Sequence, residues 1–412
     1  MSNNNTLYGG IVVALIIGVA VGWVIYPTMN PVSTEDMVSR SLYNAALDDV
    51  AAAQTELDAA IADAAADLAA AQTDIAAAEA DVASAEADLA AAEAELDALK
   101  APKKVGLVLA TGGLGDKSFN DISLAGCQKA KDELGVDFDY VETTAISEYE
   151  GYQRDFAMSG EYMLIICIGY DQAEGLAIVA EEFPDQNFVL IDMVVGNPNV
   201  ASLTFRANEG SYLVGVVAGM MSETGTIGFI GGMVDPLILD FYRGYEAGAI
   251  WANPAVTVAP AAYVGSFGDP VAAKELTTAQ IELGIDSVYS AAGKSGLGAL
   301  EAAHDAGVDA YGVDLCQDYL YDEMVASMTK RVDLAVFEMI LDALVDKFQG
   351  GFYSGGIAEG WIGMCRLPEE EGLWEELFGF EHDPLPADVL AKVKEARDGI
   401  LSGDILVPSG YD

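Results

Sequence analysis

Residues 105–121 read VGLVLATGGLGDKSFND, and this stretch decides the predicted fold. The apolar run VGLVLA predicts a buried strand, which leads through a glycine-rich turn into a helix capped by Ser118. Such a strand exit places free backbone N–H groups at the carboxyl edge of a parallel sheet, where α/β proteins hold polar ligands. Asp116 and Asn120 add hydrogen-bonding groups beside the ring of Phe119, which suits a flat ligand carrying hydroxyl or amide groups. The stretch indicates binding rather than catalysis.

Downstream of this stretch, apolar runs alternate with amphipathic stretches of 12 to 20 residues. This βα alternation predicts an α/β protein with doubly wound parallel sheets. About 300 residues exceed a single hydrophobic core, so we expect two lobes with a cleft between them. Lobe 1 should cover about 103–210 plus returning C-terminal segments, and lobe 2 about 220–315. We expect the hinge near 204–215 on the way out and near Asp314 and Lys330 on the return. The predicted strands lie at 105–110, 138–141, 163–169, 187–192, 226–232, 256–265, 286–293 and 309–314.

The N-terminal residues 1–40 contain a candidate membrane anchor and a short linker. Residues 11–26 carry no charge, and with 7–10 they reach about 20 residues, enough to span a bilayer. Trp23 and Tyr26 lie where an interfacial aromatic belt would be. No Lys or Arg precedes the run, which favours an uncleaved anchor over the alternative of a removed signal peptide.

Residues 41–100 form a low-complexity segment of Ala, Asp and Glu that predicts a helical stalk. A large apolar residue recurs every seventh position from Ile61 to Leu96, with Ala at the second core position of the heptads from Ala64 to Ala92, which is typical of a coiled coil. Fourteen Asp and Glu residues without any Lys or Arg between 41 and 99 oppose self-association, unless salt screens them. An oligomeric rod and a single Ala-rich helix therefore both stay open, and either would hold the globular part away from a membrane.

The composition excludes several classes of function. The net charge of −47 argues against nucleic acid or anionic lipid as a partner, and it fits either adaptation to salt or simple solubility. The histidines His304 and His382 are far apart, and there is no G-x-S-x-G elbow, no G-x-x-x-x-G-K-[ST] loop and no Cys/His cluster with metal spacing. We therefore expect no enzyme, no metal and no cofactor.

The four cysteines are scattered and allow three pairings. Cys167 lies in an apolar run and is expected to be a buried thiol. A bridge between Cys316 and Cys365 is conceivable outside the cell.

Six motifs in a fixed order carry a family resemblance between residues 103 and 409. They are GDKSFND, GFIGGMVDP, YVGSFGDP, AAGKSGLG, YGVDLCQ and SMTKRVD. In this order they resemble the basic membrane protein family of PnrA-like, nucleoside-binding lipoproteins of ABC importers. The chain departs from those lipoproteins because no cysteine follows the apolar run, the first being Cys127.

The resemblance implies a two-lobed fold of the periplasmic-binding-protein type I class at 101–412. It also implies a membrane-anchored extracytoplasmic receptor that closes on a nucleoside, with purine as the expected base, and delivers it to an ABC permease. The alternative is a sensory receptor for a nucleoside or simple sugar that acts through the helical stalk.

The resemblance also assigns roles to individual residues. In the family, aromatic rings at the positions of Phe119 and Phe241 sandwich a purine, one from each lobe, whereas the plain alternative is that each ring plugs its own lobe. Asn120 would read the base edge, or else cap a helix. Asp314 and Lys330 would grip ribose hydroxyls, or else form a structural ion pair at the hinge.

Further ligand contacts are expected at the ends of other strands. Gly293 would allow the backbone to approach the ligand, although its neighbour Lys294 replaces the small residue usual in the family. Asp116, Tyr170 and Asp192 also follow predicted strands and are expected to contribute.

Overall fold

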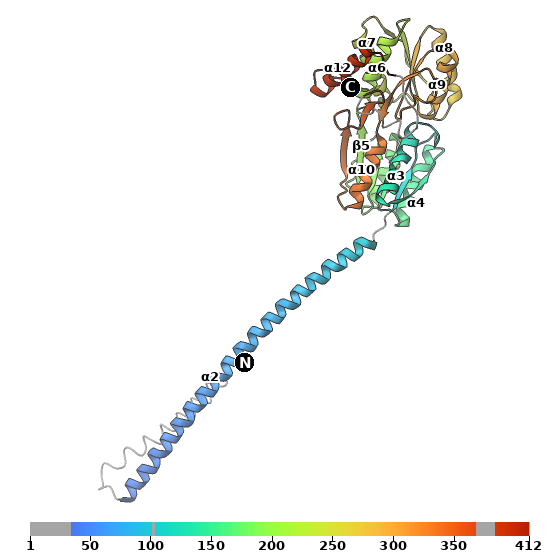
Figure 1. The fold of residues 1–412 in the computed structure, drawn as a ribbon. Helices are drawn as coiled ribbons and strands as arrows, with labels where there is room; N and C mark the ends of the chain where they lie inside the picture. Colours follow the sequence, from blue (N-terminus) through green and yellow to red (C-terminus); the bar gives the residue numbers. More distant parts are fainter. Residues whose placement is uncertain (1–33, 101–103, 368–383, 412) are drawn as a thin grey trace. The chain divides into compact units, whose positions relative to one another are not determined.

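The computed structural model describes residues 34–100, 104–367 and 384–411 (Figure 1). The predicted membrane anchor at 11–26 lies outside these residues. Within the described ranges, the structure contains no helix with an apolar stretch long enough to cross a membrane. The chain divides into two compact units, Met1–Lys100 and Ala101–Asp412.

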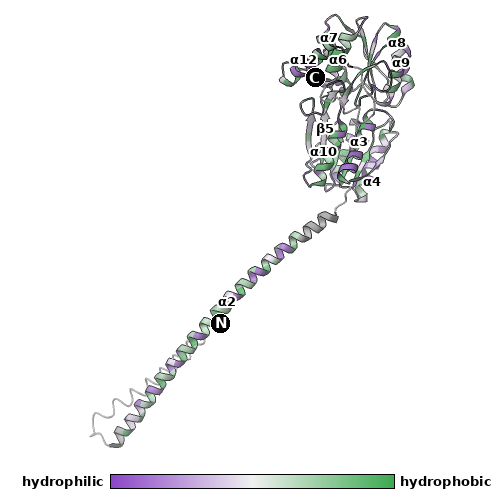
Figure 2. Ribbon diagram, in the orientation of Figure 1, coloured by the Kyte–Doolittle hydropathy of each residue, from purple (hydrophilic) through white to green (hydrophobic). Residues whose placement is uncertain are grey.

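The described part of the first unit, residues 34–100, is the continuous helix α2 (Thr34–Lys100), in the segment predicted to be helical. Alanine is the best helix former, and the segment contains no proline or glycine that would interrupt it. Hydrophilic residues recur along the part of the helix that Figure 2 colours. The seventh-position apolar residues from Ile61 to Leu89 are 54–61% exposed, so the apolar stripe of α2 is open to solvent.

The first lobe of the second unit is built on a parallel sheet with the strand order β12-β5-β4-β3-β1-β2. Every residue of β3 and β4 is buried, as expected for strands of a parallel sheet that is covered on both faces. The elements of this lobe are β1 (Lys104–Val108), α3 (Phe119–Leu134), β2 (Asp137–Val141), η2 (Ile146–Glu148), α4 (Tyr149–Ser159), β3 (Leu164–Ile168), η3 (Tyr170–Gln172), α5 (Ala173–Glu182), β4 (Phe188–Ile191), β5 (Val200–Phe205), α10 (Val332–Leu344) and β12 (Gly351–Gly355).

The second lobe repeats this architecture with the strand order β13-β11-β10-β9-β6-β7, and β8 pairs with β6. Its strand pairs are parallel except for β11 with β13. The elements are α6 (Ala207–Met221), β6 (Thr226–Gly231), α7 (Pro236–Ala252), β7 (Thr257–Val258), β8 (Ala262–Tyr263), α8 (Pro270–Glu282), β9 (Ser287–Ala291), η4 (Gly293–Ser295), α9 (Gly296–Ala306), β10 (Asp309–Gly312), β11 (Met324–Lys330), β13 (Ile362–Met364) and α12 (Ala387–Ser402).

The described chain passes between the two lobes three times, and backbone hydrogen bonds join the crossing segments. It leaves the first lobe at Arg206, returns at Arg331, and leaves again within 356–361. Arg206 N donates to Gly355 O at 2.8 Å, and Arg331 N donates to Trp361 O at 2.8 Å. The first two crossings lie close to the expected hinge segments, whereas the third was not predicted.

The second lobe is larger than the predicted range of about 220–315. Strands β11 and β13 pair into its sheet, and helices α6 and α12 pack against each other beside it. The sequence pattern could not assign these segments, because a strand's sheet is chosen by pairing with partners that are distant in the chain. The predicted strand at 256–265 is also interrupted, since β7 ends at Val258 and β8 begins at Ala262.

Helices α6 and α7 of the second lobe approach each other through glycines. A Cβ on Gly215 would lie 2.1 Å from Tyr245 O, and one on Gly248 would lie 2.0 Å from Tyr212 O. Both distances are far below any normal contact, so the backbones touch where side chains would otherwise separate them. This packing fixes the C-terminal half of α7 on α6, and the first turns of α7 contribute to the site described below.

We predict that Gly248→Ala destabilises the protein by about 1–3 kcal/mol, because the added methyl group must push α6 and α7 apart. The free energy of unfolding, measured by denaturant titration, tests this. Gly151→Ala in α4 is the matched control, since nothing lies within 4 Å of its Cβ position and Ala is the better helix former. Equal stability of the Gly248→Ala variant and the parent would contradict the packing.

Candidate functional site

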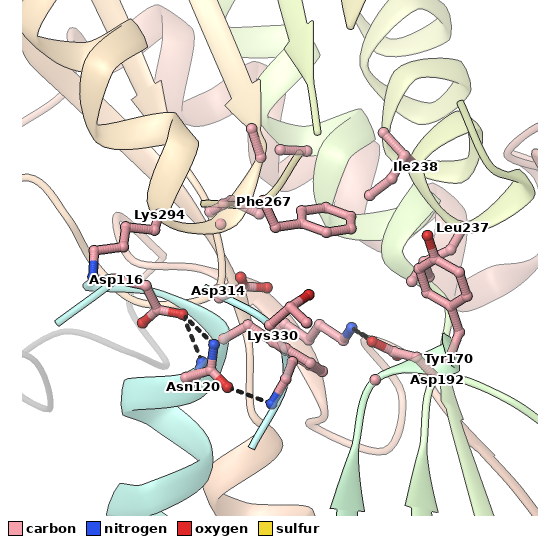
Figure 3. A pocket seen from close by; sticks show the side chains of 18 of the residues that line it. Asp116, Asn120, Tyr170, Asp192, Leu237, Ile238, Phe267, Lys294, Asp314 and Lys330 are labelled. Atoms are coloured by element: carbon pink, nitrogen blue, oxygen red, sulfur yellow. Dashed lines mark hydrogen bonds and ion pairs between the residues drawn. The ribbon is translucent and has the colours of Figure 1, made fainter. Parts of the chain in front are cut away.

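A pocket lies where the carboxyl ends of the strands of both lobes face each other, and it contains about 640 Å³ of space free of protein atoms, its open mouth included (Figure 3). The first lobe lines it with the segments that follow β1, β3 and β4. The second lobe lines it with the first turns of α7, the segment before α8, the segments after β9 and β10, and the end of β11. Parallel α/β sheets place ligands at this edge.

A buried ion pair joins the two lobes inside the pocket. Lys330 stands at the end of β11, and Asp192 comes directly after β4. Lys330 Nζ lies 2.7 Å from Asp192 Oδ1 and 2.5 Å from Asp192 Oδ2 (Figure 3). Both side chains are at most 3% exposed. Burial raises the pKa of Asp192, although the Lys330 ammonium opposes that shift. The carboxylate and the ammonium therefore depend on each other in a site with little water.

Three aromatic rings lie within about 6 Å of the same ammonium group, and two of them line the pocket. The third, Phe205, is 5.0 Å away and lies outside the pocket lining. Lys330 Nζ is 4.7 Å from the ring centroid of Phe119 and 5.9 Å from that of Phe241. The two centroids are therefore at most 10.6 Å apart, the sum of these distances. Phe119 belongs to the first lobe and Phe241 to the second, and both line the pocket.

The glycine-rich turn after β1 is fixed by Asp116 and Asn120. Asp116 accepts hydrogen bonds from the backbone N–H groups of Ser118, Asn120 and Asp121 at 2.8–3.1 Å, and so caps α3. Asn120 Nδ2 donates to Asp116 at 3.1 Å, and Asn120 Oδ1 accepts from Ala110 N at 2.8 Å. These bonds use one donor and one acceptor site of an amide that has two of each. Capping thus falls to Asp116, and Asn120 ties the turn to the strand.

Asp314, after β10, reaches across to the first lobe. Its carboxylate accepts a short hydrogen bond from Ser118 Oγ. Burial raises the pKa of Asp314 to about 6, although Lys330 and Ser118 oppose the shift. Asp314 and Asp192 both adopt left-handed backbone conformations, with φ of +67° and +73°. Such conformations are costly for a non-glycine residue and are found at functional sites.

Two more hydrogen-bonding contacts close the pocket between the lobes. Gln317 Nε2 donates to Lys117 O at 2.8 Å. Lys294 Nζ donates to Gly112 O at 3.3 Å and to Leu114 O at 3.4 Å. Lys294 therefore bridges from the second lobe to the glycine-rich turn of the first.

The structure brings the predicted site residues together. Nine of the ten line the pocket: Asp116, Phe119, Asn120, Tyr170, Asp192, Phe241, Gly293, Asp314 and Lys330. Ser118 is absent from the lining and reaches the site through Asp314.

Several lining residues were not assigned a role from the sequence. Phe267 points into the pocket from the second lobe, and its side chain lies 3.5 Å from the position a Cβ would take on Gly293 (Figure 3). Its segment, SFGDP, repeats the Ser-Phe and Gly-Asp pairs of GDKSF, so this signal was available. Asp171, directly after Tyr170, accepts a hydrogen bond from Tyr149 at 3.3 Å, and burial raises its pKa. Leu237 and Ile238 complete an apolar wall.

The charged lining is predominantly acidic. Asp116, Asp171, Asp192 and Asp314 face only two lysines, Lys294 and Lys330, in the described pocket. In the described part of the chain, the three potential metal ligands that lie within 4.8 Å of one another are Cys316, Asp318 and Cys365, none of which lines the pocket. The pocket therefore has the character of a site for a neutral or cationic organic molecule, with apolar walls and a few buried polar groups.

We predict that Lys330→Met lowers the free energy of unfolding by about 3–5 kcal/mol, because Asp192 would keep a buried charge without its partner. Lys274→Met is the control: Lys274 pairs with Glu301 at 2.7 Å on the surface, so its removal should have little effect. Denaturant unfolding of both variants at neutral pH provides the comparison. An equal loss in the two variants would show that the buried pair has no special role.

Comparisons with known proteins agree with this geometry. Residues 103–378 match the family model Bmp, described as ABC transporter substrate-binding protein PnrA-like. Basic membrane protein A of Borreliella burgdorferi is 33% identical over 321 residues, which cover 75% of this chain and 88% of that protein. An uncharacterized lipoprotein of Pyrococcus furiosus is 32% identical over 320 residues, 73% of this chain and 80% of that protein.

A solved structure gives the same result. The crystal structure of an ABC transporter solute-binding protein from Aeropyrum pernix aligns with a TM-score of 0.67 and 30% identity, covering 74% of this chain and 94% of that one. The two lobes, the pocket between them and the sequence match point the same way. The chain belongs to the basic membrane protein family of PnrA-like ABC transporter substrate-binding proteins, whose members bind solutes and are not enzymes.

Proposed function

We propose that this protein captures a nucleoside with a purine base in the pocket between its lobes and delivers it to an ABC importer. The observation that carries the proposal is the placement of Phe119 and Phe241, from opposite lobes, on one buried ammonium beside two buried carboxylates. A planar base and a hydroxylated sugar need these two kinds of surface next to each other.

The aromatic side of the pocket suits the base. Stacking on an aromatic ring contributes about 1–3 kcal/mol per base, whichever base is bound. Phe267, Leu237 and Ile238 extend the apolar surface. Asn120 keeps one donor and one acceptor site of its amide beyond its bonds with Asp116 and Ala110. These two sites support hydrogen bonding to the edge of a base.

The polar side of the pocket suits the ribose. Asp192 and Asp314 can accept hydroxyl protons, and Lys330 can donate to a hydroxyl oxygen. All three are buried, so each of these hydrogen bonds would form away from competing water.

The same charges disfavour a phosphorylated ligand. A phosphate group would meet four carboxylates, the charge of the Lys330 ammonium is already balanced by Asp192, and Lys294 is bonded to backbone carbonyls. We therefore propose that the protein selects nucleosides over nucleotides.

The N-terminal part would hold this receptor at the cell membrane. We propose that 11–26 is the anchor, that 101–412 is extracytoplasmic, and that α2 serves as a spacer of about 100 Å for its 67 residues. A homo-oligomer formed through the exposed apolar stripe would bring acidic residues together, so high salt would favour it.

Calorimetric titration of the full chain with adenosine, guanosine, inosine, uridine, cytidine, riboflavin, simple sugars and AMP tests the ligand. We expect the purine nucleosides to bind tightest, and AMP to bind much more weakly than adenosine. Phe241→Ala should weaken purine binding roughly 10- to 100-fold through lost stacking.

Phe352→Ala is the matched control for this titration, because Phe352 is 61% exposed on β12, outside the pocket. It should bind as the parent does. Parent-like binding by Phe241→Ala would rule out the stacking role, and preference for a sugar would rule out the nucleoside.

We also predict that nucleoside affinity falls as the pH drops below about 6, where Asp314 becomes protonated and accepts fewer hydroxyl protons. The folded-state pKa lies above the ordinary value of 3.8. The penalty for the buried charge is therefore present above pH 6 and is relieved as the pH falls toward 4, so protonation of Asp314 itself favours the folded state. The loss should appear in titrations at pH 5 and 7.5, and Asp314→Asn should bind weakly at both pH values. A parent affinity that is the same at both pH values would contradict the role of Asp314.

A further inference from the structure

Two cysteines of the second lobe lie together in a buried cluster away from the pocket. The sulfur atoms of Cys316 and Cys365 and one carboxylate oxygen of Asp318 all lie within 4.8 Å of one another. Cys316 is 0% and Cys365 2% exposed. Both cysteines are thiols in the structure, and the Cys316 side chain raises the pKa of Cys365 further above the value that burial alone would give.

Ser327 of β11 holds the two cysteine-bearing segments in register. Gln317 N, next to Cys316, donates to Ser327 Oγ at 3.0 Å. On the other side, Cys365 N donates to Ser327 O at 3.1 Å, and Ser327 N donates to Cys365 Sγ at 3.4 Å. Both cysteine-bearing segments are therefore hydrogen-bonded to Ser327. These bonds hold the two sulfur atoms close together.

The surroundings of the cluster favour a disulfide over a metal ion. The Asp318 carboxylate already accepts from Ser327 Oγ at 2.6 Å and forms an ion pair with Arg366 Nε at 2.8 Å. A metal would have to displace these partners, deprotonate two thiols and lie beside a guanidinium cation. A disulfide needs only the two sulfurs, at about 2.05 Å, and leaves the Asp318–Arg366 pair in place.

We propose that Cys316 and Cys365 form a disulfide when the protein folds in an oxidising compartment. The Cys316 thiolate attacks a disulfide oxidant and releases one thiol, and the Cys365 thiolate then attacks the Cys316 sulfur and releases the second thiol. The two cysteines lose two protons and two electrons, and the oxidant is reduced to two thiols. Burial hinders the reaction of both sulfurs in the folded protein. The disulfide would therefore form before folding of the second lobe is complete, and it would afterwards be protected from reductants.

The disulfide would restrain the segment after β10, which includes Asp314, a ligand contact in the proposed function. It closes a loop of residues 316–365, which contains β11, α10, β12 and β13 and passes through both later crossings between the lobes. Asp314 and Gln317, which contact the first lobe, lie within two residues of Cys316. The disulfide would therefore anchor this segment to the strand β13 of its own lobe.

Peptide mapping under non-reducing conditions tests the proposal. The full chain is refolded in a buffer of oxidised and reduced glutathione, denatured, alkylated and digested without reduction. We expect a linked peptide that contains Cys316 and Cys365, and alkylated Cys127 and Cys167. Alkylation of all four cysteines, or a different linkage, would overturn the proposal, as would stoichiometric bound zinc with both thiols of the cluster alkylatable. The glutathione buffer supplies the oxidant, so this result does not depend on the proposed location or ligand.

Thermal unfolding of variants provides a second test. The oxidised parent should unfold roughly 5 °C higher than the same protein refolded under reducing conditions. Cys365→Ala should lose this difference, and Cys127→Ala, which removes a buried thiol of the first lobe, should keep it. A difference that persists in Cys365→Ala would contradict the assignment, and the peptide map of the parent decides the matter if that variant fails to fold.

Discussion

The buried ion pair between Asp192 and Lys330 is the constraint on which the site depends. Each residue stands at the end of a strand in a different sheet, so the pair is satisfied only when the lobes meet. A buried charge without its partner is costly, which couples the position of each strand end to that of the other. The rings of Phe119 and Phe241 and the carboxylate of Asp314 are arranged around this pair.

The other polar groups of the pocket are also held at strand ends by local hydrogen bonds. A few hydrogen bonds between residues distant in the sequence join them across the cleft. Asp116 caps α3 and fixes the glycine-rich turn, and this places Ser118 where it can donate to Asp314. Lys294 contacts the same turn from the opposite lobe. Because the two lobes share these contacts, a ligand bound between them would act directly on the equilibrium between open and closed receptor.

Much of the first lobe and most of the site could be predicted from local pattern. The segment 110–121 contains its own turn residues, and the predicted strand 187–192 ends on Asp192. The polar residues at both strand ends could therefore be predicted from the sequence. Strands β5, β11, β12 and β13 were not recognised, because they are short or only partly apolar and owe their place to pairing with distant strands. Phe267 had a readable signal in SFGDP, but only the fold shows that its ring points into the cleft.

The sequence by itself determined the βα alternation, the helical stalk and the residue types at the strand exits, because periodicity and turn chemistry are properties of neighbouring residues. Only the tertiary structure decided which of those residues meet. Ser118 and Asp314 are 196 positions apart, and Lys330 and Asp192 are 138 apart. Their contact, like that of Cys316 with Cys365, depends on strand order and on the three crossings between lobes, and no local pattern in the chain encodes these.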